Sequence, residues 1–408
     1  MNRRILILTA GFGEGHNAAA RALAAACETA QGSGTARTAD IFALASPMLN
    51  AVTRRAYLSL INRAPRLWSA AYAWLDRSTM LPRGFWLLRR EIRVLDRLLD
   101  RERPAVVCST YPVYAFMLAK LAQDGRTLPP HFNIVTDSIS INSLWWRAAC
   151  AGWFLPNEDS ADVLRRAGVA AGRLHVCGFP VTPFFSAHAG KLLPPDLAGG
   201  EPGRSTAAAV PRVLYIINSG TRGAAETARR LLTATDWEIT CAVGRDDRLR
   251  RKLAPLAAAR RRPATILGWT DQIPRLLMTH HVVVSKAGGA TTQESIAACC
   301  PMIVNQIVPG QEEGNYELLR RHGVGALAET PDAVIAALHR AFADGGLVWR
   351  AWRAALAPLA RPDAARDIAA HILSPTTLPS VPNHCHLLSD ISIPAPAAPG
   401  EVHTPATA

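Results

Sequence analysis

Short apolar segments alternate with longer polar, alanine-rich segments along most of the chain. Examples are RILIL at 4–8, AVVC at 105–108 and VLYII at 213–217. Short continuous apolar runs of this kind are typical of strands that are buried on both faces, as in parallel sheets. The stretches between them are long enough for helices and rich in alanine and arginine. The pattern therefore predicts an α/β fold of repeated strand–helix–strand units around parallel sheets.

The alternation stops at residues 186–211, which are rich in Pro, Gly, Ser and Ala and have no hydrophobic period. Such a stretch predicts a linker. A chain of 408 residues, 49% of them hydrophobic, is long enough for two domains that each bury a core. We predict an N-terminal domain at 1–185, a C-terminal domain at 212–373, and a disordered tail rich in Pro, Ser, Thr and Ala at 374–408.

Residues 41–99 lack the strand–helix rhythm and interleave arginines with aromatic side chains, among them Arg54, Trp68, Trp86 and Arg89. Helices of this composition suit a membrane interface, where cations meet lipid phosphates and aromatic rings lie at headgroup depth. An ordinary helical insertion with an aromatic core has the same composition. Composition alone leaves both interpretations open.

The charge and the composition indicate which partners and which cellular compartment to expect. A formal net charge of +13 indicates attraction to an anionic partner, which is nucleic acid, a phosphorylated substrate or acidic lipid. No nucleic-acid-binding motif accompanies the charge, so we do not expect nucleic acid as a partner. No apolar run reaches the roughly 18 residues that cross a bilayer, and the N-terminus enters a strand without a signal peptide. Eight scattered cysteines without a CxxC pair fit a reducing cytoplasm.

A glycine-rich loop, TAGFGEGHN at 9–17, follows the first strand and precedes an alanine-rich helix. Gly13 and Gly15 permit a tight turn and a close approach of the backbone to a ligand, next to the positive end of the helix. The spacing differs from the dinucleotide fingerprint, and a turn needed only for packing is the alternative. His16 favours a functional site, because an imidazole at the carboxyl edge of a sheet is able to accept a proton from a hydroxyl.

A second cluster, SKAGGATTQE at 285–294, also lies between an apolar run and a helix. The backbone amides at Gly288, Gly289 and Thr291 are suited to a diphosphate. One turn further, Glu294 is placed to accept hydrogen bonds from both hydroxyls of a ribose. The alternative for Glu294 is a solvated acid on a helix face.

A third cluster, VPGQEEGN at 308–315, follows another apolar run. Gln311 and Asn315 are four residues apart and share one face if the segment is helical, which suits sugar hydroxyls. Glu312 is placed to act in the same way. Taken alone, the cluster also fits the polar start of an ordinary helix.

The order of these clusters, together with STYP, VTDSISINSLW and CGFPVTPFF, resembles the monogalactosyldiacylglycerol synthase and processive diacylglycerol glucosyltransferase group of glycosyltransferase family 28. The resemblance spans residues 4–373. It implies a GT-B fold, in which two Rossmann-like domains with parallel sheets face each other across a cleft. The N-terminal domain would hold the acceptor and the C-terminal domain the UDP-sugar.

The resemblance also implies roles for individual residues. In the donor site they are Gly288, Gly289 and Thr291 for the diphosphate, Glu294 for the ribose, Gln311, Glu312 and Asn315 for the sugar, and Ser219 and Gly220 for a loop near the phosphates. Gly13 and Gly15 would form a loop facing the acceptor and the phosphates. His16 would be the catalytic base, with Asp137 as the other candidate. The chain departs from the group at Asn17 and Asn142, where other residues are usual.

The expected activity is an inverting transfer of a hexose from a UDP-sugar to a lipid acceptor such as diacylglycerol, at the inner face of the cell membrane. We expect no cofactor and no metal, because the amide dipoles at 288–291 would carry the charge of the departing UDP. Two alternatives are a UDP-sugar 2-epimerase of the same architecture and a non-catalytic protein that binds a UDP-sugar and a membrane.

Overall fold

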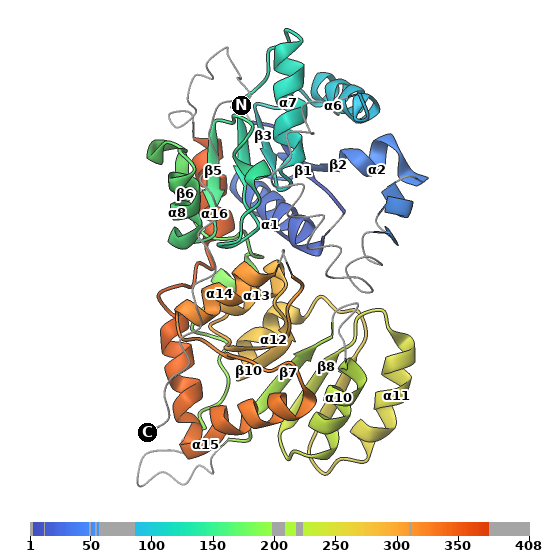
Figure 1. The fold of residues 1–408 in the computed structure, drawn as a ribbon, viewed down its shortest axis with the longest axis vertical. Helices are drawn as coiled ribbons and strands as arrows, with labels where there is room; N and C mark the ends of the chain where they lie inside the picture. Colours follow the sequence, from blue (N-terminus) through green and yellow to red (C-terminus); the bar gives the residue numbers. More distant parts are fainter. Residues whose placement is uncertain are drawn as a thin grey trace.

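The computed structural model describes residues 3–11, 13–48, 50–53, 55–56, 86–197, 209–217, 223–309 and 312–374. They form two lobes, each built on a six-stranded sheet (Figure 1). Every strand pairing in both sheets is parallel, as the apolar runs predict. The predicted α/β fold with two parallel sheets is confirmed.

The N-terminal sheet has the strand order β2-β1-β3-β4-β5-β6. Its strands are β1 (Ile5–Thr9), β2 (Ala36–Asp40), β3 (Val106–Ser109), β4 (His131–Ile134), β5 (Gly152–Leu155) and β6 (Leu174–Val176). Its helices are α1 (Glu14–Gln31), α2 (Ile41–Ala45), α6 (Arg89–Glu102), α7 (Val113–Gln123) and α8 (Glu158–Arg166), with short 3-10 turns η1 (Ser143–Trp145) and η2 (Ala171–Arg173). The short helix α9 (Phe184–His188) follows and packs on the C-terminal lobe. The strands β1, β3, β4 and β5 are buried along their whole length, which explains their continuous apolar sequence.

The C-terminal sheet has the order β12-β11-β10-β7-β8-β9. Its strands are β7 (Arg212–Ile216), β8 (Glu238–Ala242), β9 (Ala264–Leu267), β10 (Val282–Lys286), β11 (Met302–Gln306) and β12 (Ala326–Leu327). Its helices are α10 (Ala224–Thr233), α11 (Asp247–Ala258), α12 (Ile273–Thr279), α13 (Gly289–Ala297), α14 (Glu313–Arg321) and α15 (Pro331–Leu356). In both sheets the strand order reverses next to the first strand, and in open α/β sheets ligands bind at the carboxyl ends of the strands on either side of such a reversal.

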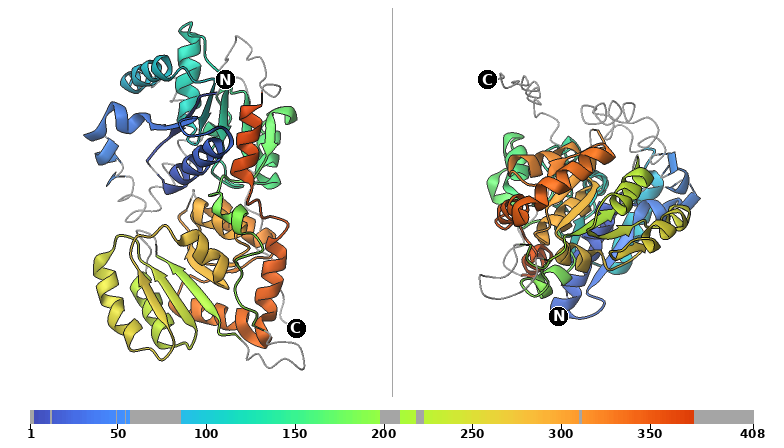
Figure 2. Two further views of the ribbon diagram at one scale, coloured as in Figure 1. Left: turned by 180° about the vertical axis from the view of Figure 1, so that it is seen from behind. Right: turned by 90° about the horizontal axis from the view of Figure 1, so that it is seen from below.

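The last helix, α16 (Ala364–Leu373), returns to the N-terminal lobe, where both lateral views place it (Figures 1 and 2). Its apolar face, including Ile368 and Ile372, joins the core formed by β1, α1 and β3. The sequence predicts these residues as part of the C-terminal domain, so the predicted boundary differs from the structure. The reason is that the amphipathic pattern of α16 marks a buried face without identifying the lobe that buries it.

The two connections between the lobes cross next to each other at Gly178. This glycine has φ = +102°, and a Cβ added there would lie 2.5 Å from the Cβ of Arg361, just before α16. Beyond it, Phe179, Val181 and Phe185 pack into the core of the C-terminal lobe. The chain therefore changes lobe near residue 178, before the linker predicted at 186–211.

Most of the predicted membrane-contacting insertion (residues 57–85), part of the linker (198–208) and nearly all of the predicted tail (375–408) lie outside the described residues. Helix α6, at the end of the predicted insertion, is amphipathic and buries Ile92, Leu95, Leu98 and Leu99 against the N-terminal core. None of the described helices combines the length and the apolar character needed to cross a bilayer.

Candidate active site

The two glycine-rich loops meet between the lobes, although nearly 280 residues of sequence separate them. A Cβ added at Gly15, on α1, would lie 3.7 Å from the backbone nitrogen of Ala290, on α13. A Cβ added at Gly289 would lie 3.2 Å from the carbonyl oxygen of Thr136, just after β4. The amino-terminal ends of α1 and α13 are therefore close together, and both carry the positive end of a helix dipole.

His16 lies in the first turn of α1, with its ring between the ends of three strands. Its Nδ1 is 2.9 Å from the hydroxyl oxygen of Thr136, and its ring makes an edge-on contact with Tyr111. Burial lowers the pKa of His16 to about 4, opposed in part by a hydrogen bond to the backbone of Thr110. The imidazole is thus neutral at pH 7 and has a lone pair that is able to accept a proton.

Asp137, the other candidate base, follows β4 and lies beside the same ring system. Its Oδ2 accepts a hydrogen bond of 2.7 Å from the indole nitrogen of Trp145. Burial raises the pKa of Asp137 to about 6, and the bond from Trp145 lowers it again in part. The centroid of a Trp145 ring is 6.5 Å from that of His16, so this tryptophan lies next to both candidates. The structure brings the two predicted bases together, and both are proton acceptors at pH 7.

The predicted diphosphate loop connects β10 to α13. Gly288 is the N-cap of α13 in an extended conformation, and Gly289 and Thr291 lie in the first turn. The first amides of a helix have no acceptor within the helix, which leaves them available to an anion. The amide of Gly288 itself donates to the carbonyl oxygen of Lys286 at 2.8 Å, so Gly289–Thr291 carry the amides available to a diphosphate, and this role remains a prediction.

The cation of Lys286 lies beside this loop, and the sequence did not predict a role for it. It forms a salt bridge with Oε1 of Glu312. The other carboxylate oxygen, Oε2, accepts a hydrogen bond of 3.1 Å from the backbone nitrogen of Val308. Glu312 is 5% exposed and holds Lys286 in place, so a sugar contact by Glu312 remains a prediction that requires an exchange of these partners.

Glu294 lies in the second turn of α13, on the side that faces α1. Burial raises its pKa to about 7, with smaller effects from Arg21, which lowers it, and Glu14, which raises it. A substantial part of the carboxyl population is therefore protonated at neutral pH. Ribose hydroxyls would donate to the ionised form and stabilise it.

Asn315 has an unused acceptor in the interior. Its Nδ2 donates a hydrogen bond of 2.9 Å to the carbonyl oxygen of Ala287, at the start of the diphosphate loop. Its Oδ1 is buried and has no hydrogen-bond partner among the described residues. A buried acceptor without a partner is costly, and a ligand hydroxyl would relieve that cost. Three other predicted donor-site residues, Ser219, Gly220 and Gln311, lie outside the described part of the chain.

A contact between the lobes next to this site was also missed. The Nε2 of Gln293, on α13, donates a hydrogen bond of 3.0 Å to the hydroxyl of Ser138. Gly314, on α14, packs so closely that a Cβ there would overlap the carbonyl oxygen of Ser138 and lie 2.5 Å from the amide nitrogen of Ser140. One feature of the sequence could have indicated this contact. Gly314 lies one residue inside a predicted helix, and a glycine in a helix often marks a site where another part of the backbone approaches closely.

Comparisons with known proteins agree with this geometry. Residues 16–181 match the family model described as monogalactosyldiacylglycerol (MGDG) synthase. The chain is 23% identical over 392 residues to the processive diacylglycerol beta-glucosyltransferase of Bacillus cereus (strain AH820), which covers 95% of this chain and 97% of the relative. The resemblance stated from the sequence is confirmed.

Solved structures share the arrangement of both lobes. The UDP-GlcNAc 2-epimerase from Neisseria meningitidis bound to UDP-GlcNAc has a TM-score of 0.53 at 12% identity, over 90% of this chain and 98% of that one. The calicheamicin glycosyltransferase CalG4 has a TM-score of 0.52 at 13% identity, over 92% and 100%. The fold is of the GT-B type. Its likeness to this epimerase and to this glycosyltransferase is nearly the same, and a shared fold does not establish a shared function.

Proposed function

We propose that this chain, a glycosyltransferase with a GT-B fold that is similar to the processive diacylglycerol glucosyltransferases, transfers a hexose from a UDP-sugar to diacylglycerol. The observation that carries the proposal is the approach of α1 to α13, which brings a neutral imidazole close to a diphosphate-binding helix terminus. A base and a stabiliser of the leaving group are the two functions that transfer requires.

In the proposed reaction, the oxygen of the acceptor hydroxyl attacks the anomeric carbon while the bond from that carbon to the β-phosphate oxygen breaks. The acceptor proton passes to His16 or Asp137. The charge that develops on UDP lies at the amides of Gly289–Thr291. Lys286 lies beside this loop, where it is ion-paired with Glu312. A single displacement inverts the anomeric centre, and none of these steps requires a metal ion.

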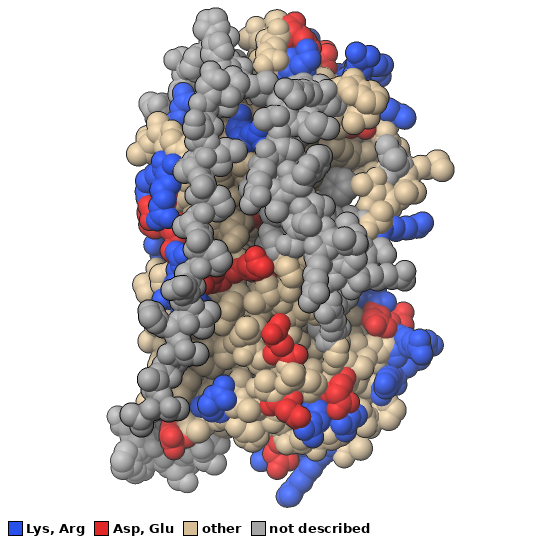
Figure 3. All heavy atoms as spheres, in the orientation of Figure 1, with Lys and Arg blue, Asp and Glu red and all other residues tan. Residues whose placement is uncertain are grey.

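The lipid acceptor would be reached at an anionic membrane surface, and we propose that this surface is the inner face of the cell membrane. Several large apolar side chains near the edge of the N-terminal lobe are more than half exposed, namely Leu44, Met48, Val52, Trp86 and Leu87. The outer face of α6 adds exposed arginines, and Figure 3 shows Lys and Arg side chains at the edge where α6 lies in Figure 1. Apolar and cationic side chains side by side favour peripheral binding to acidic lipid.

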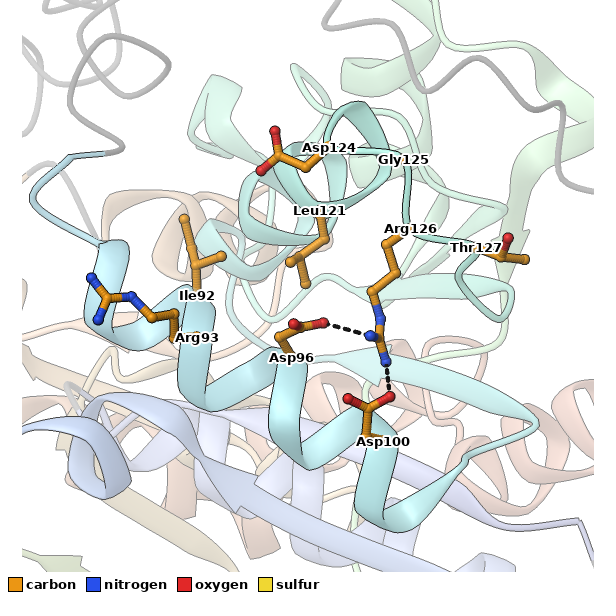
Figure 4. Close-up of a pocket in the computed structure, with 9 residues that line it drawn as sticks. All are labelled: Ile92, Arg93, Asp96, Asp100, Leu121, Asp124, Gly125, Arg126 and Thr127. Carbon is orange, nitrogen blue, oxygen red and sulfur yellow. Dashed lines mark hydrogen bonds and ion pairs between the residues drawn. The ribbon is translucent and has the colours of Figure 1, made fainter.

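A groove of about 620 Å³ between α6 and α7 adjoins these arginines (Figure 4). Arg126 in its floor is bound by Asp96 and Asp100 at 2.8 and 2.6 Å, so its charge is neutralised within the protein. Arg93 points away from this pair, toward the rim. The groove itself is therefore not an anion site, and the lipid-binding charge lies on the exposed face of α6.

The test is an assay with vesicles that contain diacylglycerol and either UDP-glucose or UDP-galactose. Mass spectrometry of the lipids is expected to show a monohexosyl product, together with release of UDP that depends on diacylglycerol. Conversion of a UDP-sugar to its C2 epimer without any lipid would indicate the epimerase instead. Binding of a UDP-sugar without transfer to any lipid would indicate a non-catalytic protein.

A further inference from the structure

Thr136 connects the candidate base to the donor lobe. We propose that Thr136 is the positioning residue of His16, and that it makes the orientation of the imidazole depend on the contact between the lobes. The proposal rests on the transfer reaction proposed above and assigns a role to a residue outside the predicted site. Thr136 is 5% exposed and lies between α1 and α13.

The ring of His16 has a hydrogen bond to the backbone of Thr110, and the second group that orients it is the side chain of Thr136. Its hydroxyl oxygen lies 2.9 Å from Nδ1, and Tyr111 contacts the ring edge-on. The opposite nitrogen, Nε2, faces the glycine loop, 4.0 Å from the position of a Cβ at Gly13. When Nδ1–H donates to Thr136, the lone pair resides on Nε2, where an acceptor hydroxyl in the cleft would meet it.

The backbone of the same residue touches the donor helix. The carbonyl oxygen of Thr136 lies 3.2 Å from the position of a Cβ at Gly289, in the first turn of α13. Two residues later, Ser138 accepts the hydrogen bond from Gln293 of α13. Residues 136–138 therefore contact the base on one side and the donor helix on the other. A shift of α13 relative to the N-terminal lobe would therefore act directly on the segment that holds His16.

The C-terminal lobe contains a matched pair without such a connection. The hydroxyl oxygen of Thr240 lies 2.9 Å from Nε2 of His280, and both residues are buried. Thr240 is on β8 and His280 ends α12, within one lobe. Replacing either threonine by valine removes a buried hydroxyl next to an imidazole, so the two variants share the structural cost and differ only in the role proposed here.

The experiment compares Thr136→Val, Thr136→Ser and Thr240→Val in the vesicle assay, using whichever of UDP-glucose and UDP-galactose the wild type transfers. We expect Thr136→Val to lower kcat about tenfold or more with KM for the UDP-sugar within about twofold, because the ring is misoriented while the donor site is intact. Thr136→Ser is expected to restore most of the rate, and Thr240→Val to leave it unchanged. In a His16→Ala background, Thr136→Val should have no further effect.

Nitrogen NMR of the His16 ring without substrate gives a readout that does not need turnover. The wild type should carry its proton mainly on Nδ1, and Thr136→Val should shift the signals toward a mixture of tautomers. Identical ring signals in both proteins, or effects of Thr136→Val and His16→Ala that simply multiply, would overturn the positioning role. A wild type that transfers no hexose while the ring signals respond to Thr136→Val would overturn the transfer reaction and leave the positioning of His16 standing.

Discussion

Replacing Gly314 by alanine tests whether catalysis needs the close approach of the two lobes. Gly314 is the second residue of α14, and its backbone does not adopt a positive φ. An added methyl group would overlap the carbonyl oxygen of Ser138 and lie 2.5 Å from the amide nitrogen of Ser140. Both are backbone atoms of the other lobe, so neither is able to rotate away.

Two opposing effects set the expected magnitude. Within the helix, alanine is favoured over glycine by up to about 1 kcal/mol, which stabilises α14 itself. Between the lobes, overpacking of this kind costs about 1–3 kcal/mol. If the closed arrangement is the reactive one, a penalty of that size lowers the rate by roughly 5- to 150-fold. The variant should therefore be about as stable as the wild type and much less active.

The assay measures kcat and KM with diacylglycerol vesicles and the thermal midpoint of the same preparations. Gly172→Ala is the matched control, because a Cβ at this exposed glycine would meet nothing within 4 Å. We expect the control to retain wild-type rate. If Gly314→Ala turns over like the wild type, the approach at Ser138 is not part of the reactive arrangement. A large drop in thermal midpoint would instead show that Gly314 serves the folding of α14.

Four further predictions concern the residues and the chemistry of the site. His16→Ala should lower kcat at least about 100-fold while UDP affinity, measured by calorimetry, stays within about twofold; a full rate would move the role of base to Asp137. Glu294→Ala should weaken UDP binding at least about tenfold, since charge-assisted hydrogen bonds to the ribose are lost. Because the pKa of Glu294 is raised to about 7, its folded state holds a proton that the unfolded chain releases near pH 4.5. The wild type should therefore lose stability relative to Glu294→Gln as the pH rises from about 4.5 to 7; a pH-independent difference in thermal midpoint would contradict that burial. A chelator should leave turnover unchanged, and a loss that Mg²⁺ restores would refute stabilisation by amide dipoles alone.

The sequence alone was sufficient for the parts that depend on local burial. Strands such as β1, β7 and β10 are continuous apolar runs because both faces of a parallel strand are covered. The polar clusters after these strands were predicted to lie at a sheet edge, since the carboxyl ends of parallel strands share one edge. The family resemblance implied the grouping of His16 with Asp137 and of Gly288 with Asn315; the structure places each pair within one lobe, and their roles remain predictions.

Only the tertiary structure decided how the two edges are combined. It placed α16 on the N-terminal lobe, paired Glu312 with Lys286, and brought Thr136 and Gly314 into the contact between the lobes. Each of these involves partners that are far apart in the sequence or a choice among several possible partners. The hydrophobic periodicity of a sequence indicates whether a side chain is buried. Which atoms bury it depends on how the two lobes pack in three dimensions.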